Sequence, residues 1–200
     1  RRGGEAGDDH RCGSAKAHVD LAGGQTADQS AIARLASGGE ARHTGGMTGS
    51  IDGPRLGPKA GGAPDSLVVL VHGYGANGED LIGLAPYLQR VLPRAAFVAP
   101  DAPESVPGVP FGRQWFAITR LDPQLLAAGA DSAAPVLDVF LDAELKRQGV
   151  APARLALVGF SQGTMMALHV GLRRAVPPVA IVGFSGALVA PERLAREIKG

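Results

Sequence analysis

Residues 155–163 read LALVGFSQG, an apolar run that leads into a Gly-x-Ser-x-Gly motif. The apolar run predicts a buried strand, and the apolar spacing from Gln162 onward predicts a helix. Ser161 would therefore occupy the tip of a sharp strand-to-helix turn, with its hydroxyl clear of neighbouring groups. Gly159 and Gly163 fit such a turn, because side chains there would collide where strand and helix cross. A serine at this place is typical of a catalytic nucleophile, since the helix start favours a developing oxyanion.

The motif alone is weak evidence, because a chain with 29 glycines can contain it by chance. The alternative is a Gly-Ser turn without chemistry. The catalytic interpretation is favoured by the context, a strand over 154–158 and a helix over 162–175. A similar segment, GFSGA at residues 183–187, has Ala187 in place of the final glycine. Its Ser185 is interpreted as part of a turn at a strand end.

A second glycine-rich segment, HGYGANG at residues 72–78, follows an apolar strand predicted over 67–71. Three glycines in seven residues allow backbone N–H groups to point into a site, as an acyl-transfer enzyme requires. A phosphate-binding loop is disfavoured, because the segment lacks the Gly-Lys-Ser/Thr ending and has no lysine. A Gly-x-Gly-x-x-Gly pattern is present nominally, but no acidic residue ends a strand about twenty positions later.

The remaining pattern predicts an α/β fold. Further apolar strands are expected over 95–98 and 179–184, and helices over 79–89, over 132–147 and from Pro191. Ser132 is the expected cap of the long helix and Gly149 its stop. Residues 100–118 are expected to form a loop rich in proline and glycine. Apolar strands that alternate with helices predict a three-layer sandwich with a mostly parallel sheet.

Residues 1–66 differ from the rest of the chain. They contain only six Leu, Ile, Val or Phe residues, and their eight basic residues balance eight acidic ones. Such a segment buries too little apolar surface to offset its ordering entropy, so disorder is expected. Met47 precedes an ordinary lead-in, so residues 1–46 are either upstream sequence translated by mistake or a real extension. Residues 67–200 are expected to be the N-terminal portion of the α/β domain.

The composition excludes several classes of function. The formal net charge is +1, and the 20 basic and 19 acidic residues are spread along the chain, so nucleic-acid binding and a metal site are not expected. No apolar run approaches the roughly 18–20 residues that span a bilayer, and no secretory signal is recognised. Cys12 is the only cysteine, which excludes an internal disulfide. The expected location is cytoplasmic.

Four segments occur in a familiar order and spacing: LVHGYG at 70–75, PDAP at 100–103, RQWF at 113–116 and GFSQG at 159–163. Together they resemble the phospholipase/carboxylesterase family of α/β hydrolases, which includes acyl-protein thioesterases. The resemblance covers residues 66–200. It implies an α/β-hydrolase sandwich, and a serine hydrolase that cleaves carboxylic esters or thioesters without a cofactor.

The resemblance also implies roles for individual residues. Ser161 matches the nucleophile, and Tyr74 and Gln162 match the residues whose backbone N–H groups form the oxyanion hole. Tyr74 stands where leucine is more usual, but a backbone donor tolerates that change. Trp115 matches an aromatic residue beside the site, with a role in packing or in substrate contact. A cysteine nucleophile, typical of dienelactone-hydrolase relatives, is absent at position 161.

The catalytic acid and base are not found in this sequence. In this family an Asp and then a His follow further strands, so both are expected after Gly200, and the fold is expected to be incomplete at its C-terminus. His72 is expected to be structural. His169 lies eight residues beyond Ser161 on one helix, about 12 Å along its axis. The 200-residue chain is therefore expected to be nearly inactive. The alternative function is a non-catalytic binding protein on the same scaffold, and the oligomeric state is open.

Overall fold

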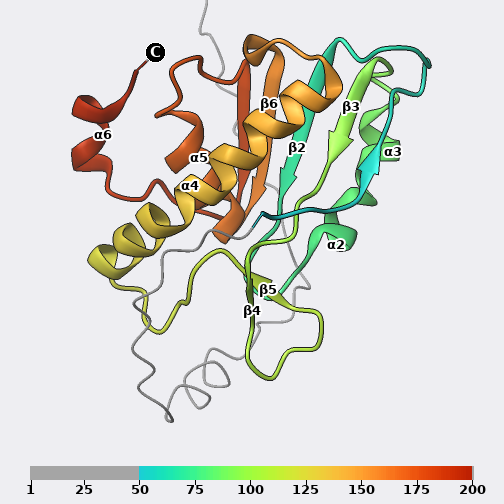
Figure 1. The fold of residues 1–200 in the computed structure, drawn as a ribbon. Helices are drawn as coiled ribbons and strands as arrows, with labels where there is room; N and C mark the ends of the chain where they lie inside the picture. Colours follow the sequence, from blue (N-terminus) through green and yellow to red (C-terminus); the bar gives the residue numbers. More distant parts are fainter. Residues whose placement is uncertain (1–49, 200) are drawn as a thin grey trace, which may run out of the picture. The chain divides into compact units, whose positions relative to one another are not determined.

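The computed structural model describes residues 50–199, which contain a five-stranded sheet (Figure 1). Its strand order is β1-β3-β2-β6-β7. The strands are β1 (Arg55–Leu56), β2 (Ser66–Val71), β3 (Ala95–Val98), β6 (Leu155–Phe160) and β7 (Ala180–Phe184). The last four pair in parallel, whereas β1 runs antiparallel to β3. All four strands expected from the apolar runs are present, and the prediction of a mostly parallel sheet is confirmed.

Helices cover both faces of the sheet, as a three-layer sandwich requires. Helices α2 (Gly78–Ile82) and α3 (Ala85–Leu88) lie on one face, and α4 (Pro123–Gln148) and α5 (Gln162–Gly171) lie on the other. Within β2, successive side chains alternate between the two cores, with Val69 facing α4 and α5 and Val68 facing α2 and α3. The continuous apolar run of β2 therefore reflects a strand that is covered on both sides.

Three predicted helices differ from the observed ones. Helix α5 ends at Gly171, four residues before the predicted end at 175. The segment 79–89 forms α2 and α3 in place of one helix, because Pro86 has no N–H to continue the hydrogen-bond ladder. Helix α4 begins at Pro123, nine residues before the expected cap, Ser132. Its N-cap is Asp122, whose side chain accepts hydrogen bonds from the next backbone N–H groups. The predicted stop is confirmed, since Gly149 is left-handed with φ 66°.

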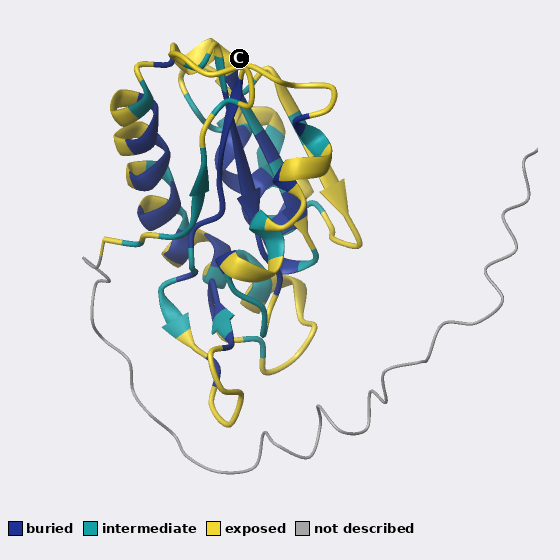
Figure 2. Ribbon diagram, turned by 90° about the vertical axis from the view of Figure 1, so that its right-hand side faces the viewer, coloured by how far each residue is buried: buried dark blue, intermediate teal, exposed yellow. Residues whose placement is uncertain are grey.

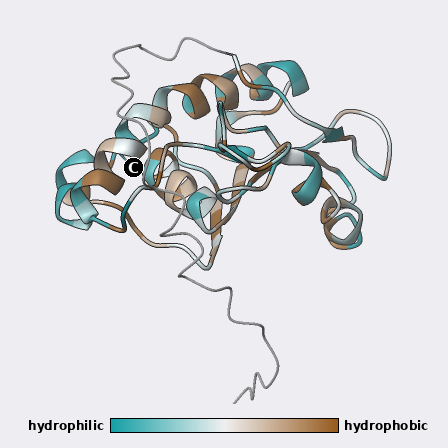
Figure 3. Ribbon diagram, turned by 90° about the horizontal axis from the view of Figure 1, so that it is seen from below, coloured by the Kyte–Doolittle hydropathy of each residue, from teal (hydrophilic) through white to brown (hydrophobic). Residues whose placement is uncertain are grey.

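Helix α4 is also long and apolar enough to cross a membrane by length and composition. Its turns alternate between hydrophobic and hydrophilic (Figure 3), and its buried residues include Leu137 and Leu141 in the core beside the sheet. Core helices of soluble proteins pass the same test, so length and composition do not assign α4 to a membrane.

The prediction that residues 1–66 are disordered is wrong for the C-terminal end of this segment. Residues 1–49 lie outside the described part of the chain. Strand β1, which belongs to the predicted extension, pairs with β3 and so joins the sheet. The guanidinium of Arg55 donates to the buried Glu144 carboxylate on α4, with its Nη2 2.9 Å from Oε2. Leu56 packs on the core under α2 and α3. These partners lie far along the sequence, so local composition does not reveal them.

The remaining elements are short. The predicted loop 100–118 contains a two-stranded ribbon of β4 (Glu104–Ser105) and β5 (Arg113–Gln114), which lies below the carboxyl ends of the sheet strands in Figure 1. The 3-10 helix η1 (Pro152–Arg154) precedes β6, and α6 (Pro191–Glu197) follows β7. The helix expected from Pro191 is thus confirmed. The tip of the ribbon is exposed, in contrast to the buried strands above it (Figure 2).

Candidate active site

Ser161 occupies a tight turn between β6 and α5. Its backbone has φ 52° and ψ −116°, a conformation that non-glycine residues rarely adopt. A Cβ on Gly159 would lie 2.5 Å from the Gly163 carbonyl oxygen, and a Cβ on Gly163 would lie 1.9 Å from the Val71 carbonyl oxygen. The predicted need for glycine at both positions is confirmed, although Gly163 is constrained by β2 and not by β6. The Ser161 side chain makes no capping hydrogen bond to α5.

Thr164 and Phe184 hold the turn in place. The Ser161 N–H donates to the Phe184 carbonyl oxygen at 2.8 Å. The Thr164 hydroxyl lies 2.8 Å from the Gly159 carbonyl oxygen and 2.9 Å from that of Phe184, and it accepts the Phe184 N–H at 3.0 Å. One side chain thereby links β6, α5 and β7. Sequence analysis missed Thr164, because no local signal pairs it with a strand twenty residues later.

The glycine-rich segment after β2 lies against the serine. A Cβ on Gly73 would be 3.2 Å from Ser161 Cβ, so any side chain at position 73 would crowd the serine. Within residues 50–199, neither the Tyr74 N–H nor the Gln162 N–H has a hydrogen-bond acceptor. The structure therefore brings the three predicted residues to one place, with two backbone donors unused.

His72 is a structural hydrogen-bonding residue, as expected. Its side chain is fully buried, Nε2 accepts the Ala102 N–H at 2.9 Å, and Nδ1 lies 2.8 Å from the Gly73 carbonyl oxygen. These contacts put the single ring proton on Nδ1. Burial lowers the pKa of His72, since the charged imidazolium would lose its hydration. With both ring nitrogens engaged, His72 has no free nitrogen for the Ser161 proton.

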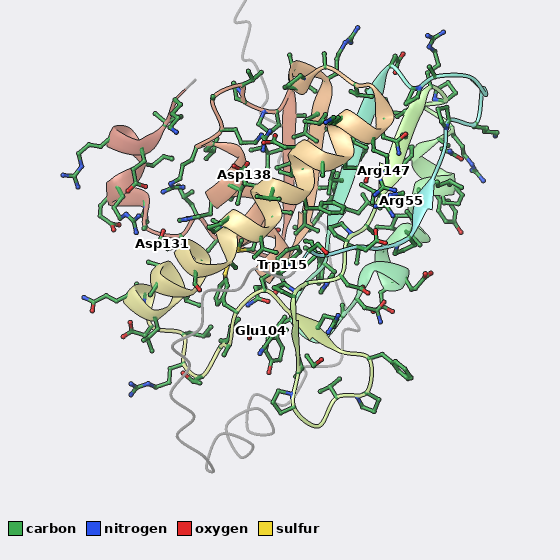
Figure 4. The ribbon with its side chains drawn as sticks, in the orientation of Figure 1. Arg55, Glu104, Trp115, Asp131, Asp138 and Arg147 are labelled. Atoms are coloured by element: carbon green, nitrogen blue, oxygen red, sulfur yellow. The ribbon has the colours of Figure 1, made fainter. Side chains whose placement is uncertain are left out.

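Trp115 lies in the core between the ribbon and the lower end of the sheet (Figure 4). Its exposed fraction is 0%, and its indole N–H donates to the His72 carbonyl oxygen at 2.9 Å. A fully buried ring offers no face to a substrate. Of the two roles considered for this residue, the structure supports packing and not substrate contact.

His169 is also engaged elsewhere. Its side chain is buried on α5, with Nε2 3.0 Å from Oδ1 of Asp131 on α4. Asp131 in turn accepts from Arg193 of α6, at 2.8 Å, and this contact lowers the Asp131 pKa. Burial lowers the pKa of His169. In the part of the chain that the structure describes, no histidine is thus placed to take a proton from Ser161, and no cluster of His, Cys, Asp and Glu could hold a metal.

Three aromatic residues of the segments around Ser161 are exposed. Phe160, which precedes the serine, is 50% exposed, and Phe184, whose carbonyl oxygen holds the serine N–H, is 53% exposed. Tyr74 is 42% exposed on the glycine-rich segment. A serine hydroxyl, two unused backbone donors and flanking aromatic rings suit the attack on a carbonyl that carries an apolar group.

Comparison with known proteins identifies the family to which the chain is similar. Residues 59–199 match the model of the phospholipase/carboxylesterase family. The chain is 30% identical to esterase YpfH of Escherichia coli over 60% of this chain and 51% of that protein. It is 31% identical to acyl-protein thioesterase 1 of Emericella nidulans over 64% of this chain and 59% of that protein. The chain thus spans little more than half the length of these curated relatives. The crystal structure of esterase PE8 aligns with a TM-score of 0.71 and 48% identity, over 76% of this chain and 71% of that one.

Proposed function

Because this chain belongs to the phospholipase/carboxylesterase family and has an α/β-hydrolase fold, we propose that Ser161 is the nucleophile of a hydrolase that cleaves carboxylic esters or thioesters. The observation that carries the proposal is the conformation of Ser161. A strained turn, made possible by two glycines, presents a hydroxyl that caps no helix beside two unused backbone donors.

The proposed reaction has two steps. Ser161 Oγ forms a bond to the carbonyl carbon while its proton passes to a general base. The oxyanion accepts hydrogen bonds from the Tyr74 and Gln162 N–H groups, and the intermediate collapses by expelling the alcohol or thiol. Water then attacks the acyl-enzyme and releases the carboxylic acid. The exposed Phe160 and Phe184 rings would lie against an apolar acyl group.

The proposal assigns the general base and its orienting acid to a part of the protein other than residues 50–199. Both histidines in this range are buried and hydrogen-bonded to other groups, His72 to Ala102 and His169 to Asp131. A triad serine without its base retains only the acceleration due to the oxyanion hole and to binding. We therefore expect residues 1–200 alone to hydrolyse p-nitrophenyl acetate close to the background rate.

Covalent labelling with a fluorophosphonate probe, applied to the full-length protein that includes the general base, tests the assignment, because the reagent reacts with activated serines. After extended incubation, mass spectrometry should find the adduct on Ser161, and Ser161→Ala should abolish it. Ser185→Ala is the matched control, since Ser185 also follows a Gly-Phe pair at the end of a strand and also has φ 52°. This variant should keep the label. An unlabelled Ser161 would favour the alternative of a non-catalytic binding protein, and a label that survives Ser161→Ala would refute the assignment of Ser161 as the nucleophile.

A further inference from the structure

The two proposed oxyanion donors belong to segments that are far apart in the sequence, and residues 113–116 connect them. On one side, this bridging segment contacts the glycine-rich segment after β2. The Gly75 N–H donates to the Arg113 carbonyl oxygen, and the Arg113 N–H donates to the Ala76 carbonyl oxygen, both at 2.9 Å. The backbone on the C-terminal side of Tyr74 is therefore held to the end of the ribbon.

On the other side, the bridging segment contacts the side chain of Gln162. Oε1 of Gln162 accepts the Trp115 N–H at 3.0 Å, and Nε2 donates to the Phe116 carbonyl oxygen at 2.8 Å. The side chain is fully buried. The carboxamide thus satisfies one backbone donor and one backbone acceptor of a segment 46 residues away. Water cannot replace these bonds at a buried position without rearrangement.

We propose that the Gln162 side chain is a positioning residue that fixes the glycine-rich segment relative to Ser161. The backbone N–H of Gln162 is one of the two oxyanion donors, and the backbone N–H of Tyr74 is the other. The Gln162 carboxamide binds the bridging segment, and the bridging segment binds the backbone next to Tyr74. The catalytic consequence rests on the proposed function, whereas the mechanical link does not. Stabilisation of an oxyanion requires donors that are placed before the reaction, so a rigid link between them matters.

Amide hydrogen exchange in Gln162→Met tests the link. The substitution keeps the backbone N–H and a similar side-chain length but removes both carboxamide bonds. We expect exchange of the Trp115, Arg113 and Gly75 amides to accelerate together, by about 10-fold or more. Acceleration of the Trp115 amide alone would overturn the inference, because it would show that the effect does not pass through the bridging segment.

Gln89→Met is the matched control. Gln89 is another buried glutamine whose Nε2 donates to a backbone carbonyl oxygen, that of Gly57, at 2.6 Å. It lies at the C-cap of α3 and contacts no part of the bridging segment. This variant should lose thermal stability without faster exchange at Gly75 and Arg113. Faster exchange there in Gln89→Met would mean that the amides report general destabilisation, and the inference would fail.

Gln162→Glu is the second variant, and it tests the link even if Gln162→Met does not fold. The introduced carboxylate can still accept the Trp115 N–H, but it cannot donate to Phe116 until it is protonated. Gly75 and Arg113 should exchange faster than in the wild type at pH 8, after correction for intrinsic rates, and should approach the wild type at pH 5. Trp115 is the only tryptophan of the chain, so its emission should follow the same pH course. No pH dependence beyond that of the wild type would contradict the inference.

Fluorophosphonate labelling of the full-length protein that includes the general base supplies the functional readout. The labelling rate at Ser161 should fall on the order of 10-fold in Gln162→Met and stay within about twofold in Gln89→Met. An unchanged rate in Gln162→Met, together with faster exchange at Gly75, would reject the positioning role while leaving the nucleophile in place. A wild type without any label would instead contradict the proposed function, and exchange would still decide the mechanical link.

Discussion

Ser161 holds a backbone conformation that costs about 1–3 kcal/mol for a residue with a side chain, so its surroundings must compensate for it. These surroundings compensate through hydrogen bonds to the backbone of the turn and of its flanking strands. The Ser161 N–H is bound by Phe184, and the Thr164 hydroxyl holds both flanking strands. Two glycines allow the chains to approach closely on either side. The strain persists because every neighbour of the turn is fixed by a contact from another element.

Gly163→Ala tests how closely the chains approach at this turn. The added Cβ would lie 1.9 Å from the Val71 carbonyl oxygen and 2.6 Å from that of His72, so helix α5 and strand β2 would have to separate. We expect the free energy of unfolding to fall by about 3 kcal/mol or more, as measured by urea denaturation.

The control for this prediction is Gly83→Ala. Gly83 lies at the C-cap of α2 with φ −57°, and a Cβ there would meet nothing within 4 Å. This variant should stay within about 1 kcal/mol of the wild type. Similar effects at the two positions would show that loss of backbone flexibility, and not the collision with β2, determines the result.

The residue scale also shows where sequence analysis succeeds. Gly159, Ser161 and Gly163 form a local pattern whose purpose is steric, and the structure confirms the steric part. Thr164 and the carboxamide of Gln162 act through partners twenty and 46 residues away. A single sequence carries no sign of such partners, so the roles of these two side chains were not predicted.

At the scale of the elements, helix α4 begins at a different cap from the one expected. Ser132 precedes an apolar stretch and was the expected cap, but it lies inside the helix, which extends from Pro123. Asp122 followed by Pro123 is a stronger start signal, since aspartate caps free N–H groups and proline suits the first helical position. Pro135 stands within α4, where proline removes one hydrogen bond of the helix.

Asp122→Ala tests the observed cap. The Asp122 carboxylate accepts the N–H groups of Gln124 and Leu125 at 2.9 and 3.1 Å. Removal of this acceptor should lower the melting temperature and cost about 1 kcal/mol of unfolding free energy. Ser132→Ala, at the expected cap, should be neutral or slightly stabilising, because alanine is the better helix former. A larger loss for Ser132→Ala than for Asp122→Ala would contradict the observed helix start.

For the described part of the molecule, strand β7 is the most exposed apolar element. It lies at an edge of the sheet, and Val182 and Phe184 are 45% and 53% exposed. The segment 179–184 contains no charge and no proline, which are the residues that usually protect an edge strand. An uncharged strand with a free edge is a template for pairing with another strand.

Val182→Lys should therefore reduce self-association of the 200-residue chain. We expect sedimentation velocity at tens of micromolar to show oligomers for the wild type, and several-fold less of them for the variant. Val139→Lys is the control, because Val139 is 68% exposed on α4 and away from the strand edge. Equal solubilisation by both lysines would show that added charge, and not protection of the β7 edge, is responsible.

The sequence by itself determined the order of strands and helices and the position of Ser161. These features depend on apolar periodicity and on glycines within a few residues of one another, which are local properties. Only the tertiary structure decided that β1 joins the sheet, that Trp115 is buried, and that the Gln162 side chain holds the bridging segment. Each of these depends on the pairing of groups that lie tens of residues apart, and the free energy of burying a polar group depends on the partner that the fold brings to it.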